Sequence, residues 1–227
     1  MNPKELKLKI LDLSPQKLYQ GCLFAAIIHA ILAGEYPELN YEHSWDGLNY
    51  SMNNSCGCRA TITFHSRYIV AVFQDYSKAI PGKNAYEYLC GMPEDLLKLA
   101  QAEALQYVLR DENGETKPVI TAAFWGTWEE LSGSQTWDDI WENGGYILEN
   151  QLLPRQQSLI RWDDYYGLTD GQMGLAQSLL DRKLADTGAP IFLNPQEAEN
   201  LYCDIEECAA SLQELNIFLP APETPHP

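Results

Sequence analysis

Residues 41–75, YEHSWDGLNYSMNNSCGCRATITFHSRYIVAVFQD, decide the fold of this 227-residue chain, because they show its clearest strand pattern. Asp46 and Gly47 are typical of a tight hairpin turn, and apolar residues alternate with polar ones at 59–65. Residues 68–73, YIVAVF, are almost continuously apolar, which favours a strand covered on both faces. Consecutive short strands joined by tight turns predict an antiparallel meander.

A long apolar helix is expected before this meander. Ser14 is a good N-cap, Pro15 suits the first helical position, and the apolar run that follows ends at Gly34. Apolar side chains surround much of this helix, which indicates burial against the sheet. His29 lies in it without a second ligand-type side chain three or four positions away, so we expect a hydrogen-bonded core residue.

The remainder of the chain has mainly helical patterns. Residues 118–125, PVITAAFW, are either a fifth strand or a buried apolar segment. Further helices are expected at 93–108, 137–141, 169–188 and 194–215. The prediction is therefore a single α+β domain, with an N-terminal helix packed on an antiparallel meander and a helix-rich acidic half after it.

Charge separates the two halves of this domain. Residues 1–90 hold eight Lys or Arg and eight Asp or Glu, whereas residues 91–227 hold seven and 24 and carry the entire net charge of −17. We therefore divide the domain into a neutral part with helix and sheet at 1–90, an acidic helical part at 91–219 and a disordered tail at 220–227. The acidic part disfavours nucleic acid and anionic membranes and favours a basic protein partner, although solubility alone also explains such charge.

No segment of the sequence predicts export or membrane insertion. The longest apolar run, residues 22–33, is shorter than the roughly 18 residues that span a bilayer, and the N-terminus lacks the pattern of a signal peptide. We expect a cytoplasmic protein with reduced cysteines. Cys22 and Cys90 have apolar neighbours and are expected to be buried thiols.

Cys56, Cys58, His43 and His65 are the candidate catalytic or metal-ligating side chains. Two thiolates and two imidazoles suit zinc, but the Cys-Gly-Cys spacing is tighter than structural zinc sites use. A cysteine nucleophile with a histidine base is a second interpretation, and a plain glycine turn is the third. Phosphate-binding glycine loops and the G-x-S-x-G motif are absent. We expect the glycine turn, with no metal and no cofactor, and retain an enzyme as the alternative.

A second candidate group combines tryptophan with acidic side chains. Its members are Trp128, Glu129, Glu130, Trp137, Asp138, Asp139 and Trp141. Aromatic rings anchor protein interfaces and carboxylates attract basic partners, so we predict a partner-binding surface, with core packing as the alternative for each ring. A small-molecule sensor with a pocket lined by Tyr and Trp is a further alternative. The sequence predicts no oligomeric state.

The run SWDGLNY, followed by RATITFH and YIVAVFQD, resembles strand–turn patterns in small acidic bacterial proteins, including toxin-immunity-like proteins. The resemblance is confined to residues 41–75 and brings no set of functional residues with it. It implies a cytosolic protein that neutralises a partner protein by binding it, without a cofactor. The predicted function is therefore non-enzymatic, inhibitory protein binding.

Overall fold

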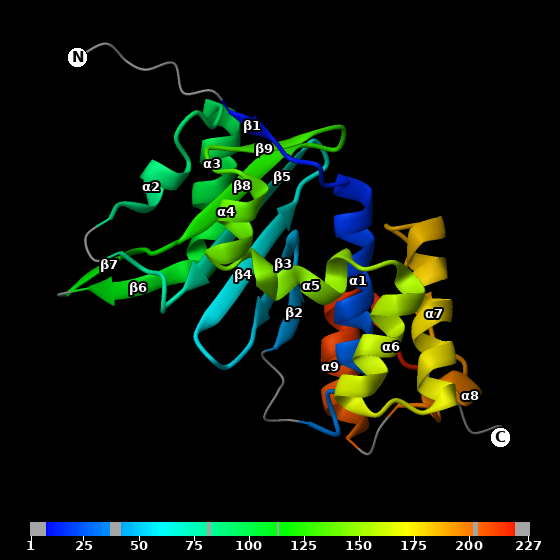
Figure 1. Ribbon diagram of the computed structural model, residues 1–227. Coiled ribbons are helices and arrows are strands. Elements are labelled where there is room, and N and C mark those ends of the chain that lie inside the picture. The colour runs from blue at the N-terminus through cyan, green and yellow to red at the C-terminus, as the bar shows by residue number, and fades with distance from the viewer. Residues whose placement is uncertain (1–7, 37–41, 81–82, 113, 202–203, 221–227) are drawn as a thin grey trace, which may run out of the picture.

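The computed structural model describes residues 8–36, 42–80, 83–112, 114–201 and 204–220. It has the expected α+β architecture, in which helices cover both faces of one large antiparallel sheet (Figure 1). The sheet has the strand order β1-β9-β8-β5-β4-β3-β2. Its strands are β1 (Lys9–Ile10), β2 (His43–Asp46), β3 (Asn49–Asn53), β4 (Cys58–Phe64), β5 (Tyr68–Asp75), β8 (Ala122–Thr127) and β9 (Leu131–Gly133).

Strands β2 to β5 form the predicted meander, each pairing antiparallel with the next. The first turn lies at Gly47 and Leu48, one residue later than predicted, because Asp46 pairs with Asn49. Gly47 has a φ of 57°, which glycine adopts without strain. Alternate side chains of β5 enter the two cores on opposite faces of the sheet, which confirms that this strand is covered on both sides.

The predicted central helix is α1 (Pro15–Leu32). The Ser14 side chain accepts a hydrogen bond from the Lys17 amide, and Pro15 occupies the first turn, as expected. The sheet lies on one side of α1, and α5 (Glu149–Leu152), α6 (Arg155–Tyr166), α7 (Asp170–Ala185) and α9 (Ile205–Glu214) surround its other sides (Figure 1). This enclosure explains why α1 is apolar around most of its circumference.

The opposite face of the sheet packs against a smaller helical layer. This layer consists of α2 (Ala85–Tyr88), α3 (Glu94–Ala102) and the 3₁₀ helix η2 (Ala104–Val108). Val70, Val72 and Trp125 contribute the sheet side of this second core. The acidic half of the chain thus supplies α3 and η2 as well as two strands of the sheet, β8 and β9. Of the predicted strand or buried segment at 118–125, residues 122–125 lie in β8, whereas 119–121 lie in no strand.

Two of the predicted helices are interrupted. The helix expected at 93–108 ends where Glu103 leaves helical geometry, with φ −119° and ψ −97°, and accepts a hydrogen bond from the Asn49 side chain. The last helix is split into α8 (Pro195–Ala198) and α9, because the Asp204 carboxylate caps the amides of Glu206 and Glu207 and starts a new helix.

Several elements were not predicted. They are α2, the hairpin β6 (Leu109–Glu112) and β7 (Glu115–Pro118), β9, the 3₁₀ helix η3 (Gly145–Leu148), α5, α6 and β11 (Ile217–Phe218). Strand β11 pairs parallel with β10 (Ile191–Phe192), which lies in a segment predicted to be extended. The predicted short helix is α4 (Trp137–Glu142), and α7 begins after the Thr169 cap as expected. The expected disorder of the tail falls on residues 221–227, outside the described residues, apart from position 220.

Burial corrects one cysteine prediction and confirms another. Cys22 is fully buried, whereas Cys90 is exposed because it lies beyond the end of α2, outside the second core. His29 is a buried, hydrogen-bonded residue of α1, as predicted. Within the described part of the chain, no helix combines the length and the apolar character needed to traverse a membrane.

Candidate functional site

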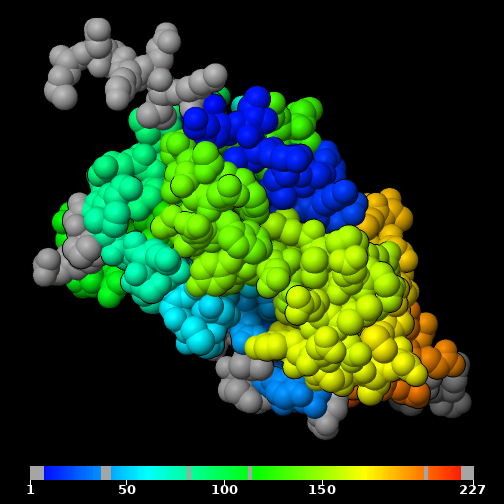
Figure 2. All heavy atoms as spheres, in the orientation of Figure 1, coloured from blue at the N-terminus to red at the C-terminus, as the bar shows by residue number. Residues whose placement is uncertain are grey.

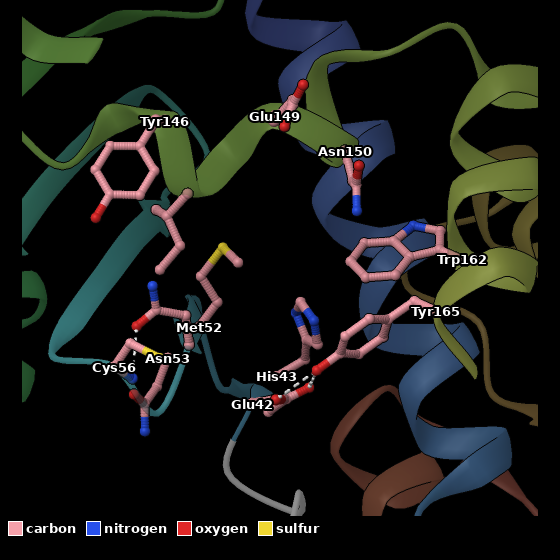
Figure 3. A pocket seen from close by; sticks show the side chains of 12 residues that line it. Glu42, His43, Met52, Asn53, Cys56, Tyr146, Glu149, Asn150, Trp162 and Tyr165 are labelled. Atoms are coloured by element: carbon pink, nitrogen blue, oxygen red, sulfur yellow. Dashed lines mark hydrogen bonds between the residues drawn. The ribbon is translucent and has the colours of Figure 1, made fainter. Parts of the chain in front are cut away.

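A pocket of about 360 Å³ lies between the β2–β3 hairpin and helices α5 and α6. We name it the Glu42 pocket, and Figure 3 shows the twelve residues that line it: Glu42, His43, Met52, Asn53, Asn54, Cys56, Tyr146, Ile147, Glu149, Asn150, Trp162 and Tyr165. In the space-filling view it forms a hollow between the cyan residues of the β3–β4 region and the yellow-green residues of α6 (Figure 2). No lysine or arginine is among the described residues that line it.

Glu42 provides a buried carboxylate at one side of the pocket, with only 8% of the residue exposed. The Tyr165 hydroxyl donates to both carboxylate oxygens, at 2.9 and 3.1 Å, and the Tyr166 hydroxyl donates to Oε2 at 3.3 Å. No ion pair of the described residues involves Glu42. Buried carboxylates are usually paired with a cation, so neutral hydroxyls alone leave this charge uncompensated.

The two tyrosines remain hydrogen-bond donors over the whole physiological pH range. Burial, reinforced by the adjoining Glu42 carboxylate, raises the pKa of Tyr165 to about 12. The same two causes raise the pKa of Tyr166 still further. The Tyr166 hydroxyl also lies 3.2 Å from Nδ1 of His29, so the carboxylate is connected to the central helix.

His43 stands beside Glu42 as a neutral imidazole. Its Nδ1 lies 2.7 Å from the Tyr50 hydroxyl, which accepts a hydrogen bond from the Gln151 amide at 2.8 Å. His43, Tyr50 and Gln151 thus form one buried hydrogen-bonded chain. Burial lowers the pKa of His43 well below its usual range, and His29, with a ring centroid 5.3 Å away, lowers it further. His43 thus does not neutralise Glu42 at neutral pH.

Helix α6 supplies the aromatic wall of the pocket. Trp162, Tyr165 and Tyr166 are three and four positions apart, so a single helix presents them to the same side. Trp162 meets the His43 ring edge-on at a centroid distance of 5.2 Å and stacks on Tyr166 at 5.9 Å. Aromatic faces attract cations, most strongly when water is excluded. The aromatic wall therefore favours a positively charged ligand, as the Glu42 carboxylate does.

The four predicted Cys and His candidates are not brought together. Cys56 and His43 both line the Glu42 pocket, but their side chains lie on different sides of it (Figure 3). Cys58 is buried, its pKa is raised to about 11 mainly by burial, and its Sγ lies 3.6 Å from the Gly144 carbonyl oxygen. His65 stacks on Tyr68 at the β4–β5 turn.

The positions of these Cys and His side chains bear on both metal binding and nucleophilic catalysis. The described residues contain no group of three or more His, Cys, Asp or Glu side chains placed to hold a metal ion. For a Cys56–His43 pair, Nδ1 of His43 is already engaged by Tyr50. The pocket is therefore better arranged to hold a ligand than to activate a thiol, and an enzyme stays the alternative prediction.

The predicted tryptophan–acid group is divided between two places. Trp128, on the β8–β9 turn, packs edge-on against Tyr19 and donates its Nε1 hydrogen to the His65 carbonyl at 2.9 Å. Trp137 and Trp141 lie on α4, with ring centroids 5.9 Å apart. All three rings are half-buried, whereas the four carboxylates of the group, Glu129, Glu130, Asp138 and Asp139, are exposed. Their role in partner binding stays a prediction.

The sequence interpretation missed Glu42, Tyr165, Tyr166 and Gln151 as site residues. A signal for the aromatic pair was present, because residues 155–166 follow Pro154 and place bulky side chains at helical spacing. Nothing local indicates that Glu42, more than 120 positions away, accepts their hydrogen bonds.

Comparisons with known proteins give no indication of function. No family model, no curated protein and no solved structure matches this chain. The site is therefore defined by its own chemistry, which is an uncompensated buried carboxylate, an aromatic wall and a lining without basic side chains.

Proposed function

We propose that this chain is a non-enzymatic binding protein whose Glu42 pocket receives a Lys or Arg side chain of a basic partner protein. The observation that carries the proposal is the buried Glu42 carboxylate, whose side-chain hydrogen-bond donors among the described residues are the hydroxyls of Tyr165 and Tyr166. An ammonium or guanidinium group would supply the missing counter-charge and hydrogen-bond donors. Binding of this kind fits an inhibitory, immunity-like role in the cytoplasm.

The dimensions and lining of the pocket support this choice of ligand. A volume of about 360 Å³ holds a single long side chain, and the neighbouring Trp162 and Tyr165 rings can contact its aliphatic stem or its charged head. The net charge of −17 would attract a basic partner before contact.

The proposal is tested by calorimetric titration with two kinds of cation. One is a free amine or guanidine, such as butylamine or agmatine, and the other is a lysine- and arginine-rich peptide. We expect both to bind, the peptide more tightly because of its additional charges, while butanol and a glutamine-rich peptide do not bind. Binding of agmatine without any gain from the peptide would point instead to a small-molecule sensor, which is the alternative use of this pocket.

The matched variants are Glu42→Gln and Glu149→Gln. Glu42→Gln keeps the shape of the side chain but removes its charge, so we expect agmatine affinity to fall by about tenfold or more. Glu149 also lines the pocket, but it is exposed and its carboxylate points away (Figure 3), so Glu149→Gln should have little effect. Equal binding by the original chain and Glu42→Gln would refute the proposal.

A further inference from the structure

A second cavity, of about 260 Å³, lies among α1, α6 and α7. We name it the Ser158 pocket, and it shares no lining residue with the Glu42 pocket. Its apolar wall includes Phe24 of α1, Leu152 at the end of α5, and Leu180 and Leu184 of α7. Helices α5, α6 and α7 each pack against α1 (Figure 1), so elements far apart in sequence meet around this pocket.

The charges around the Ser158 pocket are opposite to those of the molecule as a whole. Lys17 and Arg155 line it, and no Asp or Glu does so among the described residues. The Arg155 guanidinium is fixed by Asp181 Oδ1 at 2.6 Å and the Gln177 carbonyl oxygen at 2.7 Å. Lys17 takes part in none of the ion pairs formed by the described residues. The rim is therefore basic in a chain with 32 acidic and 15 basic residues.

Ser158 gives this pocket an unsatisfied polar group. The residue is 1% exposed, and its hydroxyl has no hydrogen-bond partner. Leaving a buried hydroxyl unsatisfied is unfavourable, so its presence in the lining of this pocket favours a ligand with a polar atom. Ser158 is in the first turn of α6, a helix of 12 residues that begins at Arg155 and whose N-cap residue, Pro154, provides no side-chain hydrogen bond. An uncapped N-terminus attracts negative charge.

We propose that the Ser158 pocket binds a small amphipathic carboxylate, of the chemical class of medium-chain fatty acids. The alkyl chain lies against Phe24, Leu180 and Leu184. The carboxylate accepts a hydrogen bond from the Ser158 hydroxyl and lies near Lys17 and the start of α6. This inference is independent of the Glu42 pocket, which selects the opposite charge.

The test uses octanoate as the probe and 1-octanol as its uncharged counterpart, in calorimetric titrations of the full chain. We expect octanoate to bind at least tenfold more tightly than octanol, because only the carboxylate can use the serine hydroxyl, the lysine and the helix terminus. Ser158→Ala is the decisive variant. It should leave the ligand-free protein equally or more stable, since it removes an unsatisfied hydroxyl, and yet weaken octanoate binding about tenfold.

Two further variants locate the site. Lys17→Met should weaken octanoate binding several-fold, whereas Lys98→Met, which makes the same change of net charge on α3, should not. Glu42→Gln should leave octanoate affinity unchanged, which separates this inference from the proposed function. Equal affinity for octanol and octanoate, or undiminished octanoate binding by Ser158→Ala, would overturn it.

Discussion

At the scale of single residues, Glu42 and His43 are adjacent buried residues that could in principle form an ion pair. Among the described residues, the side chains that donate hydrogen bonds to the Glu42 carboxylate are two tyrosines, and burial, together with the nearby His29, lowers the pKa of His43. A protonated His43 would have compensated the Glu42 charge from within the protein. Because burial lowers the pKa of His43, this imidazole supplies no counter-charge to Glu42 at neutral pH, and under the proposed function a cationic ligand supplies it.

The lowered pKa of His43 predicts an acid-sensitive stability. The unfolded chain binds a proton at His43 below its ordinary pKa near 6.5, whereas the folded chain does not, so unfolding is favoured as pH falls through that value. Between pH 7 and pH 5 this residue alone should lower the free energy of unfolding by about 2 kcal/mol. Urea unfolding of the original chain and of His43→Gln at both pH values measures the difference. An unchanged pH dependence in His43→Gln would contradict the prediction.

At the scale of elements, the position of α5 depends on its close approach to α1. A Cβ atom added at Gly21 would overlap the Gln151 carbonyl oxygen, so only glycine permits this crossing. The same Gln151 donates to Tyr50 in the His43 network. The contact between the two helices therefore fixes a residue that supports the Glu42 pocket, although Gly21 itself lines only the other pocket.

Two glycine substitutions test this dependence. Gly21→Ala should destabilise the protein by about 2 to 3 kcal/mol, because the overlap involves backbone atoms that must move apart. Gly174→Ala is the control, since nothing lies within 4 Å of a Cβ atom there. It should stabilise α7 by about 0.5 to 1 kcal/mol, as alanine favours a helix interior. Chemical denaturation measures both, and a Gly21→Ala protein as stable as the original chain would show that α5 is free to shift.

At the scale of the whole molecule, the acidic half is not a separate structural unit. Its strands β8 and β9 continue the sheet beside β5, so the charge difference between the two halves does not follow a boundary in the fold. The exposed carboxylates on the β8–β9 turn and on α4 belong to the same body as the Glu42 pocket. Under the proposed function, long-range attraction of a basic partner acts together with binding of one of its cationic side chains in the pocket.

Charge reversal tests the contribution of the predicted acidic surface. Changing Glu129, Glu130, Asp138 and Asp139 to lysine should slow association with a lysine- and arginine-rich peptide by about tenfold at low salt, and much less at high salt. Stopped-flow association kinetics measures this effect. The matched control reverses four other exposed acids, Asp95, Glu115, Asp164 and Glu206, and so changes the net charge equally. Equal slowing by both variants would mean that only net charge matters and that no particular surface binds the partner.

The sequence predicted more of the helices and strands than of the candidate site. Ser14-Pro15, the alternation at 59–65 and the apolar run at 68–73 indicate α1 and the meander directly, because caps and periodicity are local signals. The breaks at Glu103 and Asp204 were missed because a side-chain hydrogen bond at one residue ended an otherwise continuous apolar stripe. Among the site residues, His43 and Cys56 could be named as candidates from residue type alone. The role of Glu42 could not be predicted, because its hydrogen-bond donors lie on the distant helix α6.

The sequence by itself determined the α+β class, the buried helix before an antiparallel meander, and the excess of acid in the second half. These properties follow from short-range periodicity, capping and composition, which need no knowledge of distant contacts. Only the tertiary structure decided where the two pockets lie and which charged side chains line each of them. Burial and pairing depend on residues more than 120 positions apart meeting across α1 and the sheet, as Glu42 meets Tyr165 and Tyr166.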